Sequence, residues 1–280
     1  MEWSKVKNII ILLLLLVNGF LLVLVGMRQE RTDQYQRSAL TQAVEVLEQN
    51  GIQVEEEKLS DVQGLVSQSV ERSTQGEQDL VRTLLGEDAV RVDQGGGLYT
   101  YENSRGQVSI RPGGEISARM AADGGWETQD PLSHAQQLLD NAGVKAELLE
   151  AQLEQGSGTV LFRQQWQAAP LFSSHILFAY QDGRLTGIEG TLLIQEQGQT
   201  SAVGDTGEAI TLPTALLRFL DGVLTSGEVC TAIESMQAGY LASQSFSGSI
   251  SLNPTWLIRS DTADYYLSAV TGELTRVSEG

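Results

Sequence analysis

The longest apolar stretch of the sequence runs over residues 9–27 and contains no charged residue. About 20 consecutive apolar residues are needed for a helix to cross the hydrocarbon core of a bilayer. A secretory signal peptide has a shorter apolar region followed by a small-x-small cleavage site, and no such site follows this run. The pattern therefore predicts an uncleaved transmembrane anchor over 9–27, with a cleaved signal peptide as the alternative.

The charges around this run do not decide its orientation. Lys5 and Lys7 precede it and Arg28 and Arg31 follow it, so the count of positive charges is equal on both sides. A short head, residues 1–8, before a long polar chain is the layout of an anchor with a cytoplasmic N-terminus. We therefore expect a single-pass protein of the plasma membrane with an extracytoplasmic C-terminal domain.

Beyond residue 27, apolar residues recur first at helical spacing and then in short alternating runs. The helical spacing predicts a stalk helix within 28–50, which ends at an Asn-Gly pair. Strand-like runs separated by turn residues follow and predict an N-terminal lobe over 51–123. An Asp-Gly-Gly sequence at the end of this range marks the boundary between two lobes.

The remaining sequence, 124–280, predicts a C-terminal lobe in which a helix followed by antiparallel strands occurs twice. Asp130 and Pro131 are typical of the start of the first helix. The repeated order of elements divides this lobe into two candidate units, 124–205 and 206–280. The expected fold class is α+β: a single N-terminal transmembrane helix, then an exported two-lobed domain of antiparallel sheets with helices.

Composition excludes several classes of function. The 280 residues carry 36 acidic and 18 basic side chains, a formal charge of −18. Nucleic-acid binding needs a basic surface, which such a chain does not offer. One cysteine and two histidines exclude an intrachain disulfide and a Cys/His zinc site. We accordingly expect no catalytic residues, no metal site and no cofactor, and an enzyme is the least favoured class.

The few reactive side chains have ordinary structural explanations. His134 falls in the first turn of a predicted helix and is expected on its solvated face. His175 alternates with apolar residues on one face of a predicted strand, and a pH-sensing role is the alternative. Cys230 lies among apolar residues and is expected to be a small buried side chain.

Two groups of residues are candidates for contact with a partner protein. Asn18 lies in the middle of the apolar run, where a polar side chain is costly in lipid unless another helix bonds to it. With Gly19 it predicts a helix–helix contact, and a lone tolerated Asn is the alternative. Trp256, Tyr265 and Tyr266 fall on predicted strands. Core packing is the default for these aromatics, and a partner-facing patch is the alternative.

Both ends of the sequence resemble the YycI family. At the N-terminus the resemblance rests on Met1-Glu2-Trp3-Ser4-Lys5, on Lys7, and on an apolar run broken by Asn18 and resumed by Phe20-Leu21-Leu22. Toward the C-terminus it rests on Gly239-Tyr240, Leu252-x-Pro254-x-Trp256, Tyr265-Tyr266 and Thr271-Gly272.

The resemblance implies a role in signalling. YycI proteins, with the related YycH, are single-span membrane proteins of Gram-positive bacteria. Their exported domains are built from PepSY-like units and work with a sensor histidine kinase of the WalK type. The implied function is therefore a membrane-anchored accessory regulator of such a kinase, acting by protein–protein contact, with a YycH-like protein as a second candidate partner. A cell-envelope module that binds a peptide or inhibits a protease, as PepSY-type units suggest, is the alternative.

Overall fold

The computed structural model describes most of the chain from residue 34 onward. The described residues are 14, 17–18, 34–60, 64–194, 202–203, 209–244 and 249–277. No helix within these ranges is both long enough and apolar enough to cross a membrane. This finding contradicts the predicted single transmembrane helix, and we correct that prediction. Apart from residues 14, 17 and 18, the range 9–27 lies outside the described residues, as does the predicted head, 1–8.

Two hydrophobic cores divide the described chain into two lobes. The core of the terminal lobe draws its buried side chains mainly from 43–70 and 212–269. The core of the central lobe draws them from 80–192. The structure thus divides the chain differently from the expected boundary at 123–124. Strands on either side of that point pair with each other in one sheet, so this stretch lies inside the central lobe.

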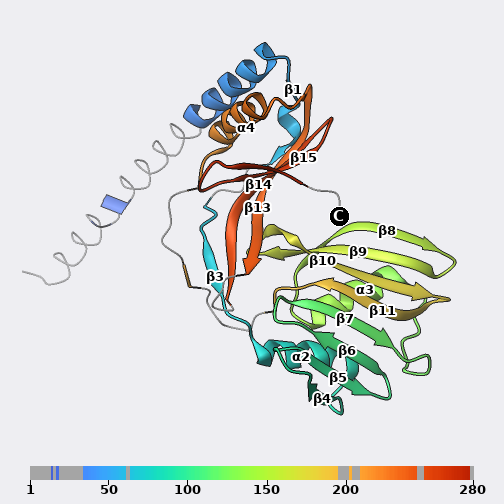
Figure 1. The fold of residues 1–280 in the computed structure, drawn as a ribbon. Helices are drawn as coiled ribbons and strands as arrows, with labels where there is room; N and C mark the ends of the chain where they lie inside the picture. Colours follow the sequence, from blue (N-terminus) through green and yellow to red (C-terminus); the bar gives the residue numbers. More distant parts are fainter. Residues whose placement is uncertain are drawn as a thin grey trace, which may run out of the picture.

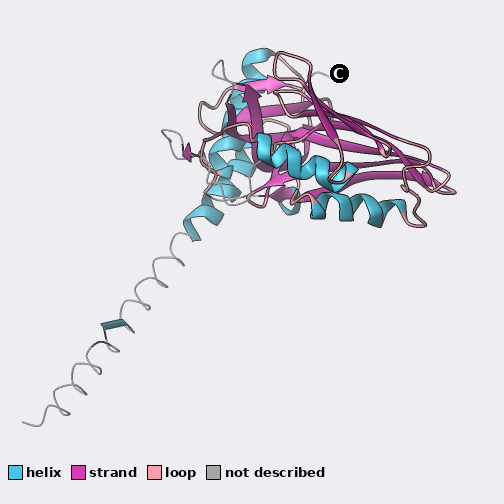
Figure 2. Cartoon of the chain, turned by 90° about the horizontal axis from the view of Figure 1, so that it is seen from below, coloured by secondary structure: helices cyan, strands magenta, loops and turns pink. Residues whose placement is uncertain are grey.

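The central lobe is an antiparallel sheet with two helices on one face (Figures 1 and 2). Its first half contains α2 (Thr74–Leu85), β4 (Val90–Asp93), β5 (Tyr99–Asn103), β6 (Gly106–Ile110) and β7 (Glu115–Met120). Its second half contains α3 (Pro131–Asn141), β8 (Ala146–Glu154), β9 (Ser157–Trp166), β10 (Ala169–Gln181) and β11 (Arg184–Thr191). The strand order β4-β5-β6-β7-β11-β10-β9-β8 leaves β4 and β8 at the two edges.

The terminal lobe combines both ends of the described chain. Its early elements are a helix over 34–49, β1 (Gln53–Val54), the 3-10 helix η1 (Glu56–Lys58), β2 (Leu59–Ser60) and β3 (Gln68–Val70). Its late elements are β12 (Ala202–Val203), α4 (Leu212–Ser226), β13 (Ala232–Gln244), β14 (Ile250–Ser260), β15 (Asp264–Ser268) and β16 (Leu274–Arg276). The helix over 34–49 lies beside α4 (Figure 1) and buries Ala43, Val44 and Leu47, so it belongs to this core.

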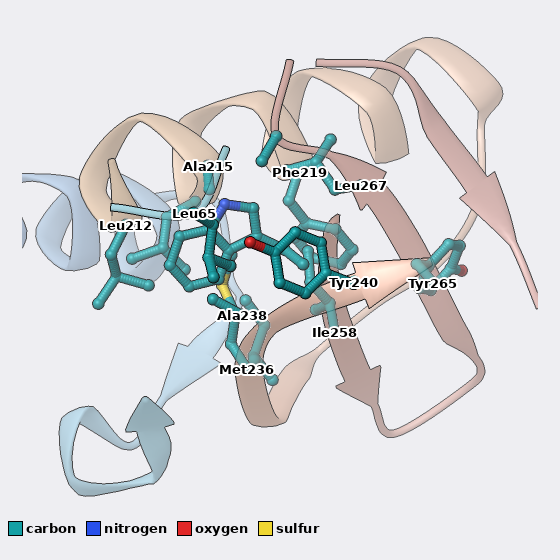
Figure 3. Packing of buried hydrophobic residues seen from close by; sticks show 14 of the residues in the cluster. Leu65, Leu212, Ala215, Phe219, Met236, Ala238, Tyr240, Ile258, Tyr265 and Leu267 are labelled. Atoms are coloured by element: carbon teal, nitrogen blue, oxygen red, sulfur yellow. The ribbon is translucent and has the colours of Figure 1, made fainter. Parts of the chain in front are cut away.

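Apolar side chains of α4 fill the space between that helix and the sheet. Leu212, Ala215 and Phe219 point toward the strands, where Tyr240 and Leu267 meet them (Figure 3). The buried positions of α4 recur at spacings of three and four, which places them on one face of the helix. Gly227, with φ of 70°, ends the helix in the left-handed conformation that glycine adopts without strain.

One order of elements occurs three times in the described chain. A helix followed by a four-stranded antiparallel meander spans 74–120, 131–191 and 212–276. The second and third occurrences fall within the two candidate units expected from the sequence. The first occurrence was not expected, and its strands β4, β5 and β6 have only four or five residues each. The fold is α+β with a mainly antiparallel sheet.

The hairpin of β9 and β10 joins the lobes. Its tip, Gln167 and Ala168, has positive φ at both residues, the type I′ conformation that suits a two-residue hairpin. Trp166 beside the tip is buried in the terminal core and donates from its indole nitrogen to Gln68 Oε1 at 3.0 Å. Gln68 Nε2 in turn donates to the Tyr240 hydroxyl at 3.0 Å. The bond from Trp166 to Gln68 crosses from one lobe to the other and continues to Tyr240, so the lobes share part of one polar network.

Candidate functional site

The structure separates the residues that the sequence proposed for partner contact. Asn18 donates its side-chain N–H to the carbonyl of Leu14 at 3.0 Å, one turn earlier in its own helix, and Gly19 lies outside the described residues. Trp256 and Tyr265 are each only 2% exposed and belong to the terminal core. Tyr266 is half-buried, with its ring 6.0 Å from that of Phe172.

The alternation of side chains along a strand explains this separation. Successive residues of a strand point to opposite faces of the sheet, so Tyr265 and Tyr266 cannot share one surface. Tyr265 packs its ring 5.5 Å from Phe219, in an edge-to-face arrangement, and its hydroxyl bonds to Glu228. The three aromatics therefore form no common partner-facing patch, and core packing, the default interpretation, holds for two of them.

The first histidine has a structural partner. His134 Nδ1 lies 3.0 Å from the Tyr180 hydroxyl, and the side chain is half-buried, so the prediction of a solvated face is wrong. Burial lowers the pKa of His134 and raises the pKa of Tyr180 well above its usual range. The neighbouring Ser133 hydroxyl bonds instead to Asp130, which caps the N-terminus of α3. Ser133, His134 and Asp130 thus form no nucleophile–base chain.

His175 and Cys230 lie apart from the pair of His134 and Tyr180. His175 is half-buried on β10 opposite Arg163, and burial, with the charge of Arg163, lowers its pKa. Cys230 is buried, as predicted, and burial raises the pKa of its thiol. Within the ranges that the structure describes, no group of three or more His, Cys, Asp or Glu side chains is placed to hold a metal ion.

The longest exposed edge strand of the central lobe is β8. All nine of its residues are at least partly exposed. Leu148 and Leu149 are 47% and 37% exposed, which is unusual for two adjacent leucines in a strand. Among the described strands, β8 pairs only with β9, so its other edge carries no described neighbour (Figure 1). An uncovered strand edge offers backbone N–H and C=O groups to another extended segment.

The turn after β8 shows which of its backbone groups point outward. Gln155 and Gly156 have φ of 49° and 79°, the type I′ conformation of a two-residue hairpin loop. Glu154 and Ser157 close this loop. In such a hairpin the closing pair is hydrogen-bonded across the two strands. The backbone groups of Glu154 therefore point toward β9.

Hydrogen-bonded and non-hydrogen-bonded pairs alternate along an antiparallel ladder. Counting back from Glu154, the N–H and C=O groups of Gln152 and Glu150 also point toward β9. Those of Leu153 and Ala151 point away from β9, toward the open edge. The register shifts between Leu148 and Glu150, so the regular outward-facing pattern extends over 150–154.

One face of β8 is acidic. Glu147, Glu150 and Glu154 share the face on which Glu147 lies 3.6 Å from the buried guanidinium of Arg163. Gln152, on the same face, donates to Glu150 Oε1 at 2.6 Å. Neither Glu150 nor Glu154 has an ion-pair partner among the described residues. The open edge therefore combines exposed leucines, unpaired carboxylates and outward-facing backbone groups.

The sequence pattern of β8 did not indicate a partner-binding strand. It lies within a run that was predicted as an ordinary strand after the first C-terminal helix. Two signals could have drawn attention to it: adjacent leucines between glutamates, and the absence of Lys and Pro from 146–154. Lys and Pro are residues with which proteins protect exposed edges.

The fold and this edge define the class of the protein: a two-lobed α+β protein whose central sheet ends in a long, exposed, acidic edge strand. No protein-family model and no curated protein matches the sequence. Among solved structures, an uncharacterized protein from Eubacterium rectale matches with a TM-score of 0.47 and 11% identity, over 81% of this chain and 90% of that one.

A second solved structure is the C-terminal domain of YpeB from Bacillus megaterium. It matches with a TM-score of 0.36 and 13% identity, over 75% of this chain and 100% of that one. Both scores are below 0.5, and neither match assigns this chain to a family. The resemblance to YycI proteins accordingly stays a prediction.

Proposed function

We propose that this protein is a non-catalytic accessory regulator that acts by binding another protein. The observation that carries the proposal is the edge of β8, nine residues long, which no described strand covers and which has exposed leucines and carboxylates beside outward-facing backbone groups. A sensor histidine kinase of the WalK type is the partner that the resemblance to YycI proteins implies. The buried polar bonds between the lobes support a body that keeps this edge in a fixed orientation.

The mechanism is a shift in the populations of two signalling conformations of the kinase. A regulator changes such an equilibrium only by the difference in its affinity for the two conformations. A tenfold difference in affinity corresponds to about 1.4 kcal/mol. The formal charge of −18 favours a basic surface on the partner, because opposite potentials speed association and discriminate against acidic competitors.

The test uses the full chain and the candidate kinase. An affinity-tagged full chain is crosslinked to co-expressed kinase in membranes, and the effect of the chain on kinase autophosphorylation is measured. We expect crosslinked kinase and an autophosphorylation rate that changes with the concentration of the chain. Absence of both effects would overturn the proposal. Recovery of a protease whose activity the chain inhibits would favour the alternative module instead.

A matched control variant keeps this test specific. Arg91→Ala changes β4, at the opposite edge of the same sheet, and removes a guanidinium that lies 3.8 Å from the centre of the Tyr99 ring. Because β4 is at the other end of the strand order, this variant should crosslink to the kinase as the wild type does. If Arg91→Ala reduced crosslinking to the kinase as much as changes in β8 do, the contact with the kinase would not be specific to β8.

A further inference from the structure

We infer that β8 receives one extended, basic segment of the partner as an additional strand of the central sheet. This inference rests on the proposed function and names the part of the partner that makes contact. It concerns the segment 150–154, where the backbone pattern is regular. Its three supports are an equivalent strand elsewhere in the chain, the direction of the backbone groups, and the charge of the edge.

The first support is the equivalent strand in the terminal lobe. β13 is the first strand of the unit 212–276, as β8 is of the unit 131–191. Extended segments from elsewhere in the chain pair with the outer edge of β13: β1, β2, and β10 at Leu171 opposite Tyr240. All three run parallel to β13. In one of the three units of this chain, therefore, the first strand accepts added strands, whereas β8 and β4 lack one among the described residues.

The second support is the backbone of β8. The N–H and C=O groups of Ala151 and Leu153 point away from β9, as the hairpin geometry requires. Strand addition uses such groups to bind the main chain of a partner, and alternate side chains supply specificity. At the other edge, β4 has only four residues, which offers fewer such groups.

The third support is charge, and it selects the occupant. A second copy of this chain would place Glu150 and Glu154 beside the same carboxylates, and like charges directly opposite each other destabilise a strand pair. A basic strand would place lysines or arginines there instead. Leu148 and Leu153 lie on the opposite face of β8. Apolar residues at the alternate positions of the added strand would pack against them. The matching segment therefore alternates basic and apolar residues.

The probe is a fluorescent nine-residue peptide of alternating lysine and valine, titrated with the full chain and followed by fluorescence anisotropy. A peptide of alternating glutamate and valine tests the role of charge. A peptide of alternating lysine and proline keeps the positive charge but lacks every second N–H. We expect binding of the lysine–valine peptide only, and weaker binding as salt is raised. Equal binding of the lysine–proline peptide would overturn the inference, because charge alone would then suffice.

The decisive variant is Ala151→Pro, which removes an outward-facing N–H and leaves the bonds to β9 in place. We expect the lysine–valine peptide to bind at least about tenfold more weakly. Ala151→Val keeps the N–H at the same position and should bind within about twofold of the wild type. Circular dichroism checks that both variants fold. Equal affinity of the proline variant and the wild type would contradict strand addition.

A second variant tests the carboxylates. Glu150→Gln combined with Glu154→Gln keeps the shape of the edge and removes two charges. Loss of two cross-strand ion pairs should weaken the binding of the lysine–valine peptide about 2- to 30-fold. Unchanged affinity would exclude the basic segment as the occupant.

The kinase experiment separates this inference from the proposed function. Kinase that crosslinks equally well to the wild type and to Ala151→Pro would leave the regulator proposal standing and overturn the docking of its segment on β8. Peptide binding that needs Ala151 N–H, in a chain that neither captures the kinase nor alters its autophosphorylation, would support the edge site and overturn the kinase as partner.

Discussion

The units 131–191 and 212–276 have the same order of elements, but their first strands differ in what lies beside them. β13 has β14 on one side and β1, β2 and β10 on the other, so it lies inside its sheet. β8 has β9 on one side only, among the described strands. The position of a strand in its sheet is thus decided by distant segments and not by its own unit.

The burial of side chains follows this difference. β13 buries Ile233, Met236, Ala238 and Tyr240 in the terminal core, whereas no residue of β8 is fully buried. The first helices of the two units, α4 and α3, differ in burial in the same direction as β13 and β8. α4 buries six apolar residues and has no polar residue among them, whereas α3 buries four residues in a more polar sequence. The unit with the covered strand is therefore the better-packed one, and the unit with the free strand keeps an edge available.

The largest expected effect comes from the core beneath the covered strand. Phe219→Ala removes a fully buried ring that packs against Tyr265 and should lower the free energy of unfolding by about 3–5 kcal/mol. Urea unfolding measures it. Leu217→Ala, on the exposed face of α4 at 43% exposure, is the control and should cost less than about 1 kcal/mol. Similar losses in both variants would contradict the packing described for α4.

A smaller loss of stability is expected from a substitution at the point where β10 meets β13. Gly239→Ala would place a Cβ atom 2.4 Å from the carbonyl oxygen of Pro170 and 2.7 Å from Cζ of Phe172. Overpacking of this kind costs about 1–3 kcal/mol. The control is Gly187→Ala on β11, where the nearest atom, the carbonyl oxygen of Ala118, would lie 3.3 Å away. A thermal melt in which Gly187→Ala is the more destabilised variant would refute the close approach of β10 and β13.

The stability of the central lobe should depend on pH through His134. Burial lowers the pKa of His134 in the folded protein, so the unfolded chain binds a proton more readily. The free energy of unfolding should therefore decrease as the pH falls below about 6.5, the ordinary histidine pKa, toward the lower folded value. His134→Gln should reduce this dependence, as measured by urea unfolding at pH 7.5 and 5.5. His175, whose pKa is also lowered, contributes in the same direction.

If the wild type and His134→Gln lose equal stability between these two pH values, the bond between His134 and Tyr180 does not hold the neutral imidazole. His175→Gln is the matched comparison, because that side chain lies on the opposite face of β10 from Tyr180.

The smallest expected effect on stability is at the free edge. Leu149→Ser on β8 should change the free energy of unfolding by no more than about 0.5 kcal/mol, because the side chain is 37% exposed. The matched change Met236→Ser on β13, where the side chain is fully buried, should cost several times as much. Chemical denaturation of the two variants, side by side, checks the contrast between the strands. A large loss from Leu149→Ser would mean that β8 has a cover within this chain.

The sequence predicted local structure where a residue acts on its immediate neighbours. Asp130 caps α3 through the N–H of Ser133 and Pro131 occupies the first turn, as the sequence indicated. Cys230 is buried, as its apolar neighbours predicted. The sequence did not decide between core packing and partner contact for Trp256 and Tyr265, which are both buried. No pattern on a single strand tells which face of a sheet will be covered.

By itself, then, the sequence determined the α+β class, the helix that starts at Asp130, and an acidic chain with few reactive side chains. These follow from propensity, capping and composition, which act within a few residues or over the chain as a whole. Only the tertiary structure decided that 51–60 and 64–70 join the terminal lobe, that His134 meets Tyr180 and that no described strand covers the outer edge of β8. Each of these depends on contacts between segments far apart in the sequence, where hydrogen-bonded registers and the burial of two shared cores select one arrangement.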